Sequence, residues 1–242
     1  MRPLLALGLF LTVAATHAAD AWRVAVVGNA PPMSYAAAGG RLTGFNVELG
    51  RALCDTLEHR CEFKLYPLGE VLDVVAKGQV DFAMVSLLVT PERSAKVLFT
   101  KPLYRSLSVW LSAHPFPGQS VPAQAVAVVQ GSAQHSYGQV RGWPLKVMTT
   151  HAEVFDAVAS GQAQAALLPM NTGMTVVRDR RFGATGWNYL LVGEPGLSGD
   201  VAISVSPSQP QLVERLNEAL DKLRRNGRFD RINTEFLPFR LQ

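Results

Sequence analysis

Few residues of this chain have the types and the spacing that catalysis requires. His114, His135 and His151 stand apart from one another, and the sequence has no GxSxG elbow, GxGxxG turn, P-loop or HExxH helix. His135, next to Gln134, is the best placed of these histidines, although a position on a surface helix is its simpler interpretation. Because general acid–base chemistry needs a carboxylate or an imidazole held at the reacting atom, the sequence does not predict an enzyme.

The first residues predict export from the cytoplasm. Arg2 precedes an uncharged apolar run over residues 4–15, and the small residues around Ala18 suit a signal peptidase. We therefore expect residues 1–18 to be a signal peptide and the mature protein to be free in the periplasm. The apolar run is shorter than the roughly 20 residues of a membrane helix, and no later segment reaches that length.

Cys54 and Cys61 are the two cysteines of the chain, and export would place them where disulfides persist. The six residues between them suit a bridge from the last turn of a helix to the start of the next strand. A metal site and two free thiols are the alternatives, but His59 alone completes no set of metal ligands. We expect a disulfide, and neither a metal nor a cofactor.

The composition predicts a folded protein with a weak, dispersed positive charge. A chain of 242 residues with 48% hydrophobic side chains can form the cores of one large or two modest domains. The 23 Lys and Arg are interspersed with 19 Asp and Glu, which leaves a formal charge of +4. This distribution says little about nucleic acid, which we do not expect as a partner, and at most it favours an anionic over a cationic solute. We expect the protein to be a monomer.

Short apolar strands alternate with helical segments along the chain. The pattern predicts strands at 23–27, 61–65 and 80–85, with helices between them at 46–57, capped by Asn46, and at 68–76. A second unit follows, with a strand at 126–129 and a helix at 152–159. The helices of the two units end alike, as VAKGQ at 75–79 and VASGQ at 158–162, and an apolar strand follows each. Alternating strands and helices predict parallel α/β sheets, and the repetition predicts two lobes.

The division into lobes follows from where the chain is extended without helix signals. We assign residues 19–108 and 200–242 to a first lobe and residues 109–199 to a second. Crossings between the lobes are expected at 105–113 and 200–204. A helix at 210–225 and a short helix near Asp230 would complete the first lobe.

Several segments together resemble the periplasmic solute-binding proteins of polar amino-acid ABC importers. They are GFNVEL at 44–49, the cysteine pair, TPERS and FTKPLY between 90 and 104, VVQGSAQ at 128–134, and LRRNGRFDRI at 223–232. The resemblance implies the α/β type II periplasmic-binding-protein fold, with two strand crossings between the lobes. It also implies that a small solute binds between the lobes by hinge closure and that an ABC permease in the inner membrane is the partner.

The resemblance further implies where the solute binds. Arg93, three residues after Thr90, would hold the carboxylate of the solute, because a guanidinium offers two parallel donors. Taken without the resemblance, Arg93 would be an exposed arginine at a helix start. Ser86 and Thr90 would assist it from the first lobe, and Ser132 and Gln134 from the second, although Ser132 also suits a helix N-cap. The remaining cleft positions of the family fall on Ala30, Leu68, Leu88 and Pro169.

These cleft positions depart from the family pattern. Val27, Ala30, Leu68 and Leu88 stand where the family usually has Asp, two aromatic residues and Ser, and Pro169 stands where an acidic residue usually receives the ammonium group of the solute. An unpaired buried cation costs several kcal/mol. We therefore expect a small anionic solute, a carboxylate with an apolar or uncharged body, unless Glu48, Glu70 or Asn171 enters the cleft.

Two other functions stay open at this point. A cleft that has lost its solute would leave an interaction or sensor module that docks to another periplasmic protein. A dehydratase-type lyase is a further alternative, because the resemblance extends to enzymes on this fold. That reaction would need a carboxylate or histidine in the cleft, and none of the motif positions supplies one.

Overall fold

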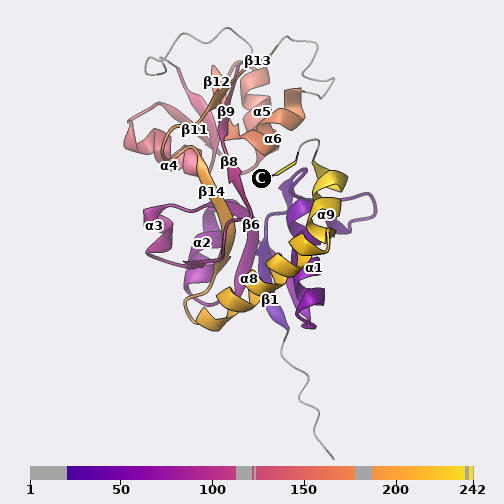
Figure 1. Cartoon of the computed structure of the whole chain (residues 1–242). Helices are drawn as coiled ribbons and strands as arrows, with labels where there is room; N and C mark the ends of the chain where they lie inside the picture. Colours follow the sequence, from indigo (N-terminus) through magenta and orange to yellow (C-terminus); the bar gives the residue numbers. More distant parts are fainter. Residues whose placement is uncertain (1–20, 113–121, 123, 178–186, 238–239, 242) are drawn as a thin grey trace, which may run out of the picture.

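The computed structural model describes residues 21–112, 122, 124–177, 187–237 and 240–241. The predicted signal peptide and His114 lie outside these residues. The chain forms two lobes, one above the other in Figure 1, each built around its own β-sheet. Among the described residues, no helix combines the length and the apolar character needed to cross a bilayer.

The first lobe, lower in Figure 1, is built on a mixed sheet. β1 (Trp22–Val26) lies between β5 (Cys61–Leu65) and β6 (Phe82–Leu88), and all three strands are parallel. β14 (Gly199–Val205) runs antiparallel to β6 and also pairs with β7 (Leu98–Phe99) and β8 (Tyr104–Ser106). A small antiparallel sheet of β2 (Asn29–Ala30), β3 (Ser34–Ala36) and β4 (Leu42–Thr43) follows β1.

Helices cover both faces of this sheet. Trp22, Val24 and Val26 of β1 belong to the core that includes α1 (Phe45–Thr56), α8 (Pro210–Arg225) and α9 (Arg228–Phe236). Ala25 packs on the opposite face, in the cluster formed with α2 (Leu68–Ala76). Successive side chains of a strand point to opposite faces, so a strand covered on both sides must be apolar throughout.

The second lobe repeats the plan of the first. β10 (Val126–Val129) lies between the parallel strands β11 (Leu145–Met148) and β12 (Ala165–Pro169), and β9 (Ser108–Ser112) and β13 (Asn188–Val192) add antiparallel strands. The order β11-β10-β12-β9 corresponds to β5-β1-β6-β14. α4 (Ala133–Val140), α5 (His151–Ala159) and α6 (Met170–Val177) belong to this lobe. Gly78 and Gly161 follow α2 and α5 with φ of 67° and 74°, the left-handed conformation expected at a helix end.

The chain passes between the two sheets twice. β8 pairs with β14 in the first lobe and β9 with β12 in the second, so the first passage is at Leu107. The second passage was expected at 200–204, and this was wrong, because β14 pairs with β6 and β8 over that stretch. Residues 193–198 make the connection instead. An apolar extended segment predicts a strand, but its pattern does not say which sheet the strand joins.

The start of α1 also differs from the prediction. Gly44, not Asn46, is the N-cap, and its φ of 114° favours glycine. The backbone N–H groups of Phe45 and Asn46 donate to the carbonyls of Pro32 and Met33. These backbone bonds take the place of a side-chain cap, so the amide of Asn46 is available for another contact.

The expected disulfide between Cys54 and Cys61 is confirmed. It joins the last turn of α1 to the first residue of β5, as the spacing predicted. The bond therefore closes the loop between a helix and the edge strand of the first lobe.

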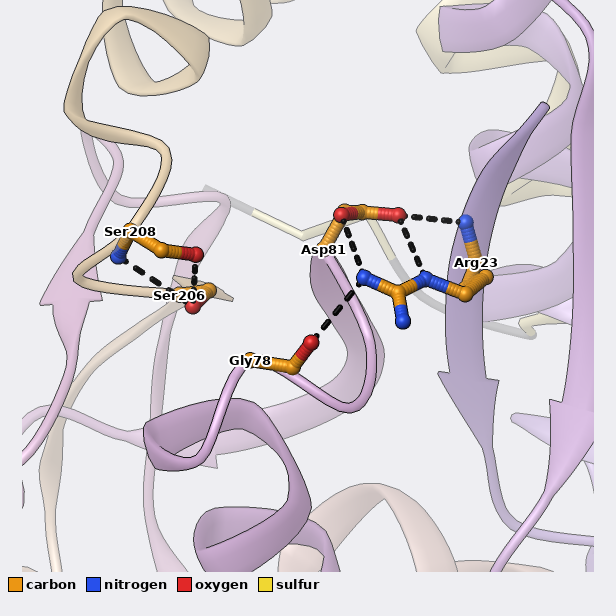
Figure 2. Close-up of polar contacts among 5 residues, drawn as sticks. All are labelled: Arg23, Gly78, Asp81, Ser206 and Ser208. Atoms are coloured by element: carbon orange, nitrogen blue, oxygen red, sulfur yellow. Dashed lines mark hydrogen bonds and ion pairs between the residues drawn. The ribbon is translucent and has the colours of Figure 1, made fainter. Parts of the chain in front are cut away.

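A network of polar contacts also stabilises the first lobe, at the amino ends of β1 and β6 (Figure 2). The Arg23 guanidinium donates to both carboxylate oxygens of Asp81, at 3.0 and 3.2 Å, and to the carbonyl of Gly78 at 2.9 Å. The backbone N–H of Ser206 donates to the carbonyl of Asp81, and the Ser206 hydroxyl contacts that of Ser208. These contacts hold the turn before β6 and the end of β14 to β1.

Candidate solute-binding site

A cavity of about 80 Å³ lies between the lobes, at the carboxyl ends of the parallel strands. Open α/β sheets bind ligands at this edge. Pockets for drug-sized ligands have volumes of about 300–1,000 Å³, so the enclosed space suits only a small solute. Eight of the predicted site residues line it: Ala30, Leu68, Ser86, Leu88, Arg93, Ser132, Gln134 and Pro169.

Arg93 is buried in the cavity wall, with 8% of its surface exposed. It belongs to the short helix α3 (Pro91–Ser94), and its Nη1 donates to the Leu88 carbonyl at 2.9 Å. Its Nη2 donates across the lobes to the Gly131 carbonyl at 3.1 Å. Burial lowers the pKa of Arg93, while the charge of Glu92 opposes this shift. No described carboxylate forms an ion pair with Arg93, and the hydrogen bonds of its guanidinium go to two backbone carbonyls.

The predicted hydroxyl and amide partners have structural contacts of their own. Thr90 is not part of the cavity wall, and its hydroxyl caps α3 by accepting from the Arg93 N–H. Ser132 lines the cavity and also caps α4, accepting from the His135 N–H at 3.0 Å. The Gln134 amide lines the cavity but donates to the Ser108 hydroxyl at 2.8 Å within the second lobe.

Asn46, freed from helix capping, belongs to a polar cluster in the cavity wall. Its Oδ1 accepts from the Ser86 hydroxyl at 2.7 Å. Ser86 has a φ of 56°, a left-handed conformation that costs a non-glycine residue about 1–3 kcal/mol and is typical of functional sites.

A second polar contact joins the lobes beside this cluster. The Asn171 Nδ2 in α6 donates to the Tyr104 hydroxyl in β8 at 3.2 Å, and both residues line the cavity. Burial raises the pKa of Tyr104 to about 12, so the phenol is neutral at physiological pH.

His151 lines the cavity, and sequence reasoning did not select it. It is the first residue of α5, and only 9% of its surface is exposed. Burial lowers the pKa of His151 to about 4, so its imidazole is neutral at physiological pH. His135, which the sequence favoured, lies outside the cavity wall, and its Nδ1 accepts from the Gly131 N–H. The signal that was missed is strand β11, whose carboxyl end leads to Thr150 and His151.

The described cavity wall contains no aspartate or glutamate. Of the three residues that could have reversed the expectation of an anionic solute, Asn171 enters the wall but carries no charge, and Glu48 and Glu70 lie outside it. Glu48 instead accepts from Thr43 and pairs with Arg51. Arg93 is therefore the one charged side chain in the described wall, and most of the remaining surface is apolar.

The lobes approach each other most tightly at two glycines. A Cβ atom added to Gly131 would lie 2.5 Å from the Cα of Gly69 and 3.0 Å from its backbone nitrogen. Gly69 is in α2 of the first lobe, and Gly131 follows β10 of the second. Only glycine at position 131 allows this backbone contact, which brings the Gly131 carbonyl to Arg93.

Comparisons with known proteins agree with this architecture. The "Putative ABC transporter arginine-binding protein 2" of Escherichia coli is 25% identical, covering 89% of this chain and 90% of its own. The "L-arginine-binding protein" of Pseudomonas aeruginosa is 26% identical, covering 97% and 95%. The named relatives are binding proteins, which fits a non-enzyme.

Solved structures share the fold. An ancestral arginine-binding protein bound to arginine has a TM-score of 0.79 at 22% identity, covering 91% of this chain and 99% of its own. A histidine kinase sensor domain with similarity to periplasmic binding proteins has a TM-score of 0.79 at 23% identity, covering 92% and 98%. The expected two-lobed fold is thereby confirmed.

The family model described as bacterial extracellular solute-binding proteins, family 3, matches residues 22–239. The match spans both lobes and every residue of the described cavity wall. This chain therefore belongs to the family 3 bacterial extracellular solute-binding proteins.

Proposed function

We propose that this protein is the periplasmic solute-binding component of an ABC importer and that its solute is a small carboxylate. Relatives named as ABC transporter and periplasmic binding proteins support the importer role and the location. The carboxylate is supported by one observation above all: Arg93 is buried in the cavity wall and has no ion-pair partner among the described residues.

The buried guanidinium of Arg93 requires a negatively charged partner, and the described residues of the cavity wall do not supply one. A buried guanidinium without an anion keeps much of its desolvation cost, even when carbonyl groups accept some of its hydrogen bonds. Arg93 bonds to two carbonyls and lines a cavity without a carboxylate in its described wall. A solute carboxylate supplies the missing negative charge and matches the planar guanidinium with two parallel hydrogen bonds.

Hinge closure explains how a permease distinguishes the solute-bound protein from the free protein. The bonds of Arg93 to Gly131 and of Asn171 to Tyr104 join the two lobes in this structure. A solute that contacts both lobes shifts the population toward this closed form. The closed form is then the state that a permease recognises.

The test compares Arg93→Met with Arg93→Lys by isothermal titration calorimetry. The probes are three- and four-carbon carboxylates, beginning with propionate and butyrate. Removing one partner of a buried ion pair costs about 3–5 kcal/mol, so Arg93→Met is expected to lose about 100-fold or more in affinity. Arg93→Lys keeps the charge but not the paired donors, and an intermediate affinity is expected.

Arg41→Met is the matched control, because Arg41 has an exposed side chain outside the cavity wall. It should bind the probes as the wild type does, and urea unfolding should show that all variants are folded. Equal affinities of Arg93→Met and Arg41→Met would contradict the proposal.

The sensor domain of similar fold supports a second candidate, a module that signals instead of delivering its solute. Thermal unfolding separates the alternatives, because a bound probe raises stability by RT ln(1 + [L]/Kd) and a solute-free interaction module gains nothing. Product analysis after incubation identifies a lyase. Capture of an ABC permease by the closed protein would favour delivery over signalling.

A further inference from the structure

His151 is a buried polar side chain that faces the cavity without a partner. Its imidazole forms no hydrogen bond within the described part of the chain, although only 9% of the residue's surface is exposed. Among described residues, Ser204 Oγ is the one fully enclosed side-chain atom without a partner. The ring nitrogens of His151 are therefore not fully enclosed, and the residue lines the cavity. Leaving a buried donor or acceptor unsatisfied costs about 1–3 kcal/mol, which a suitable solute group would recover.

Most of the other polar side chains of the wall already have a hydrogen-bond partner. Asn171 donates to Tyr104 and accepts from the Thr172 N–H. The Ser86 hydroxyl donates to Asn46, and the Gln134 amide donates to Ser108. Among the described wall residues, the side chains of His151 and Thr172 therefore have no hydrogen-bond partner, and both positions of the imidazole are free.

The imidazole of His151 and its surroundings determine which solute group can bind to it. Since burial keeps it neutral, it offers one N–H donor and one nitrogen acceptor. A hydroxyl can use either position, and a carbonyl can use the donor. An ammonium group would add a second buried cation beside Arg93, in a described wall that holds no carboxylate.

We propose that His151 selects the solute, and that the solute is a small monocarboxylate with a second, uncharged hydrogen-bonding group such as a hydroxyl or carbonyl. This rests on the proposed function, in which Arg93 holds the carboxylate. A site made of Arg93 and His151 differs from an amino-acid site, because a neutral imidazole, not an aspartate or glutamate, binds the second group of the solute.

The experiment uses probes of equal carbon number that differ in one substituent. The three-carbon set is propionate, lactate, 3-hydroxypropionate, pyruvate, alanine and β-alanine, and the four-carbon set is butyrate, 4-hydroxybutyrate and 4-aminobutyrate. Calorimetry of the full mature chain should show at least one hydroxy or keto acid binding about tenfold tighter than its unsubstituted parent. Every amino acid should bind more weakly than that parent.

His151→Phe keeps a ring of similar shape and removes the hydrogen bonds. It should abolish the tenfold preference over the parent acid, while His151→Asn, which retains a donor and an acceptor, should restore part of it. His59→Phe is the matched control, because the His59 ring stacks on Trp22 outside the cavity wall and a phenyl ring can do the same. Pro169→Asp adds a carboxylate to the wall and should reverse the order in favour of an amino acid.

The outcomes separate this inference from the proposed function. If no carboxylate binds the wild type, the proposed function is wrong and the inference falls with it. If carboxylates bind through Arg93 but the amino acids are preferred, or if His151→Phe keeps the preference for hydroxy or keto acids, only the role of His151 is overturned.

Discussion

The contact between Gly131 and Gly69 predicts that one methyl group can prevent closure without preventing folding. In Gly131→Ala the new Cβ would lie 2.5 Å from the Cα of Gly69. Carbon atoms in contact are normally about 3.5–4.0 Å apart, so the lobes must separate locally by about 1 Å. The Arg93 Nη2 to Gly131 carbonyl distance would then grow from 3.1 Å beyond the range of a hydrogen bond.

The expected loss of affinity follows from that hydrogen bond. A hydrogen bond to a charged group contributes about 1.5–3 kcal/mol, which corresponds to about tenfold to 100-fold in affinity. Folding should suffer less, because an alanine forced to the left-handed φ of Gly131, 75°, costs about 1–2 kcal/mol.

Gly161→Ala is a matched control for the backbone cost. Gly161 has a φ of 74°, and a Cβ there would meet nothing within 4 Å. Both variants should lose similar free energy of unfolding in urea, while only Gly131→Ala should lose affinity for the tightest carboxylate probe. Small-angle X-ray scattering with saturating probe should show a smaller degree of compaction for Gly131→Ala. If the two variants bind and compact equally, the glycine contact does not govern closure.

Two further predictions concern the disulfide and the Arg23–Asp81 ion pair of the first lobe. The double variant Cys54→Ser, Cys61→Ser should lose about 2–3 kcal/mol of unfolding free energy in urea, as expected for so short a loop, and should keep its affinity for the probe; an unchanged urea midpoint would contradict this. Burial by itself would raise the pKa of Asp81, but the hydrogen bonds and charge of Arg23 outweigh it and lower that pKa. The pairing therefore stabilises the fold above the ordinary carboxyl pKa of about 4, and this stability is lost as the pH falls below that value. Arg23→Met should destabilise the protein at pH 7 and much less at pH 3, and an equal loss at both would show that the ion pair is not responsible.

The sequence by itself determined the elements and their repetition. The helices at 68–76 and 210–225 and the strands at 61–65 and 126–129 have the bounds predicted from periodicity and from stop signals. These features are local, because a helix or strand reveals itself in the spacing of its own apolar residues. The disulfide could be predicted for the same reason, because it joins two elements that are adjacent in the sequence. Arg93 was selected through the motif around it, and its uncompensated charge appeared only with the fold.

Tertiary structure decided which polar groups meet the cavity. Asn46 was predicted as a helix cap, but backbone carbonyls of the preceding loop satisfy α1 and leave its amide to Ser86. Gln134 was predicted to reach the solute, but its amide bonds to Ser108. His151 was judged an isolated histidine because β11 was not recognised as a strand, and so its place beyond the carboxyl end of that strand was not seen. Each of the two hydrogen bonds joins elements of one lobe that are distant in sequence, and no pattern along the chain encodes which partner a side chain meets once the lobe folds.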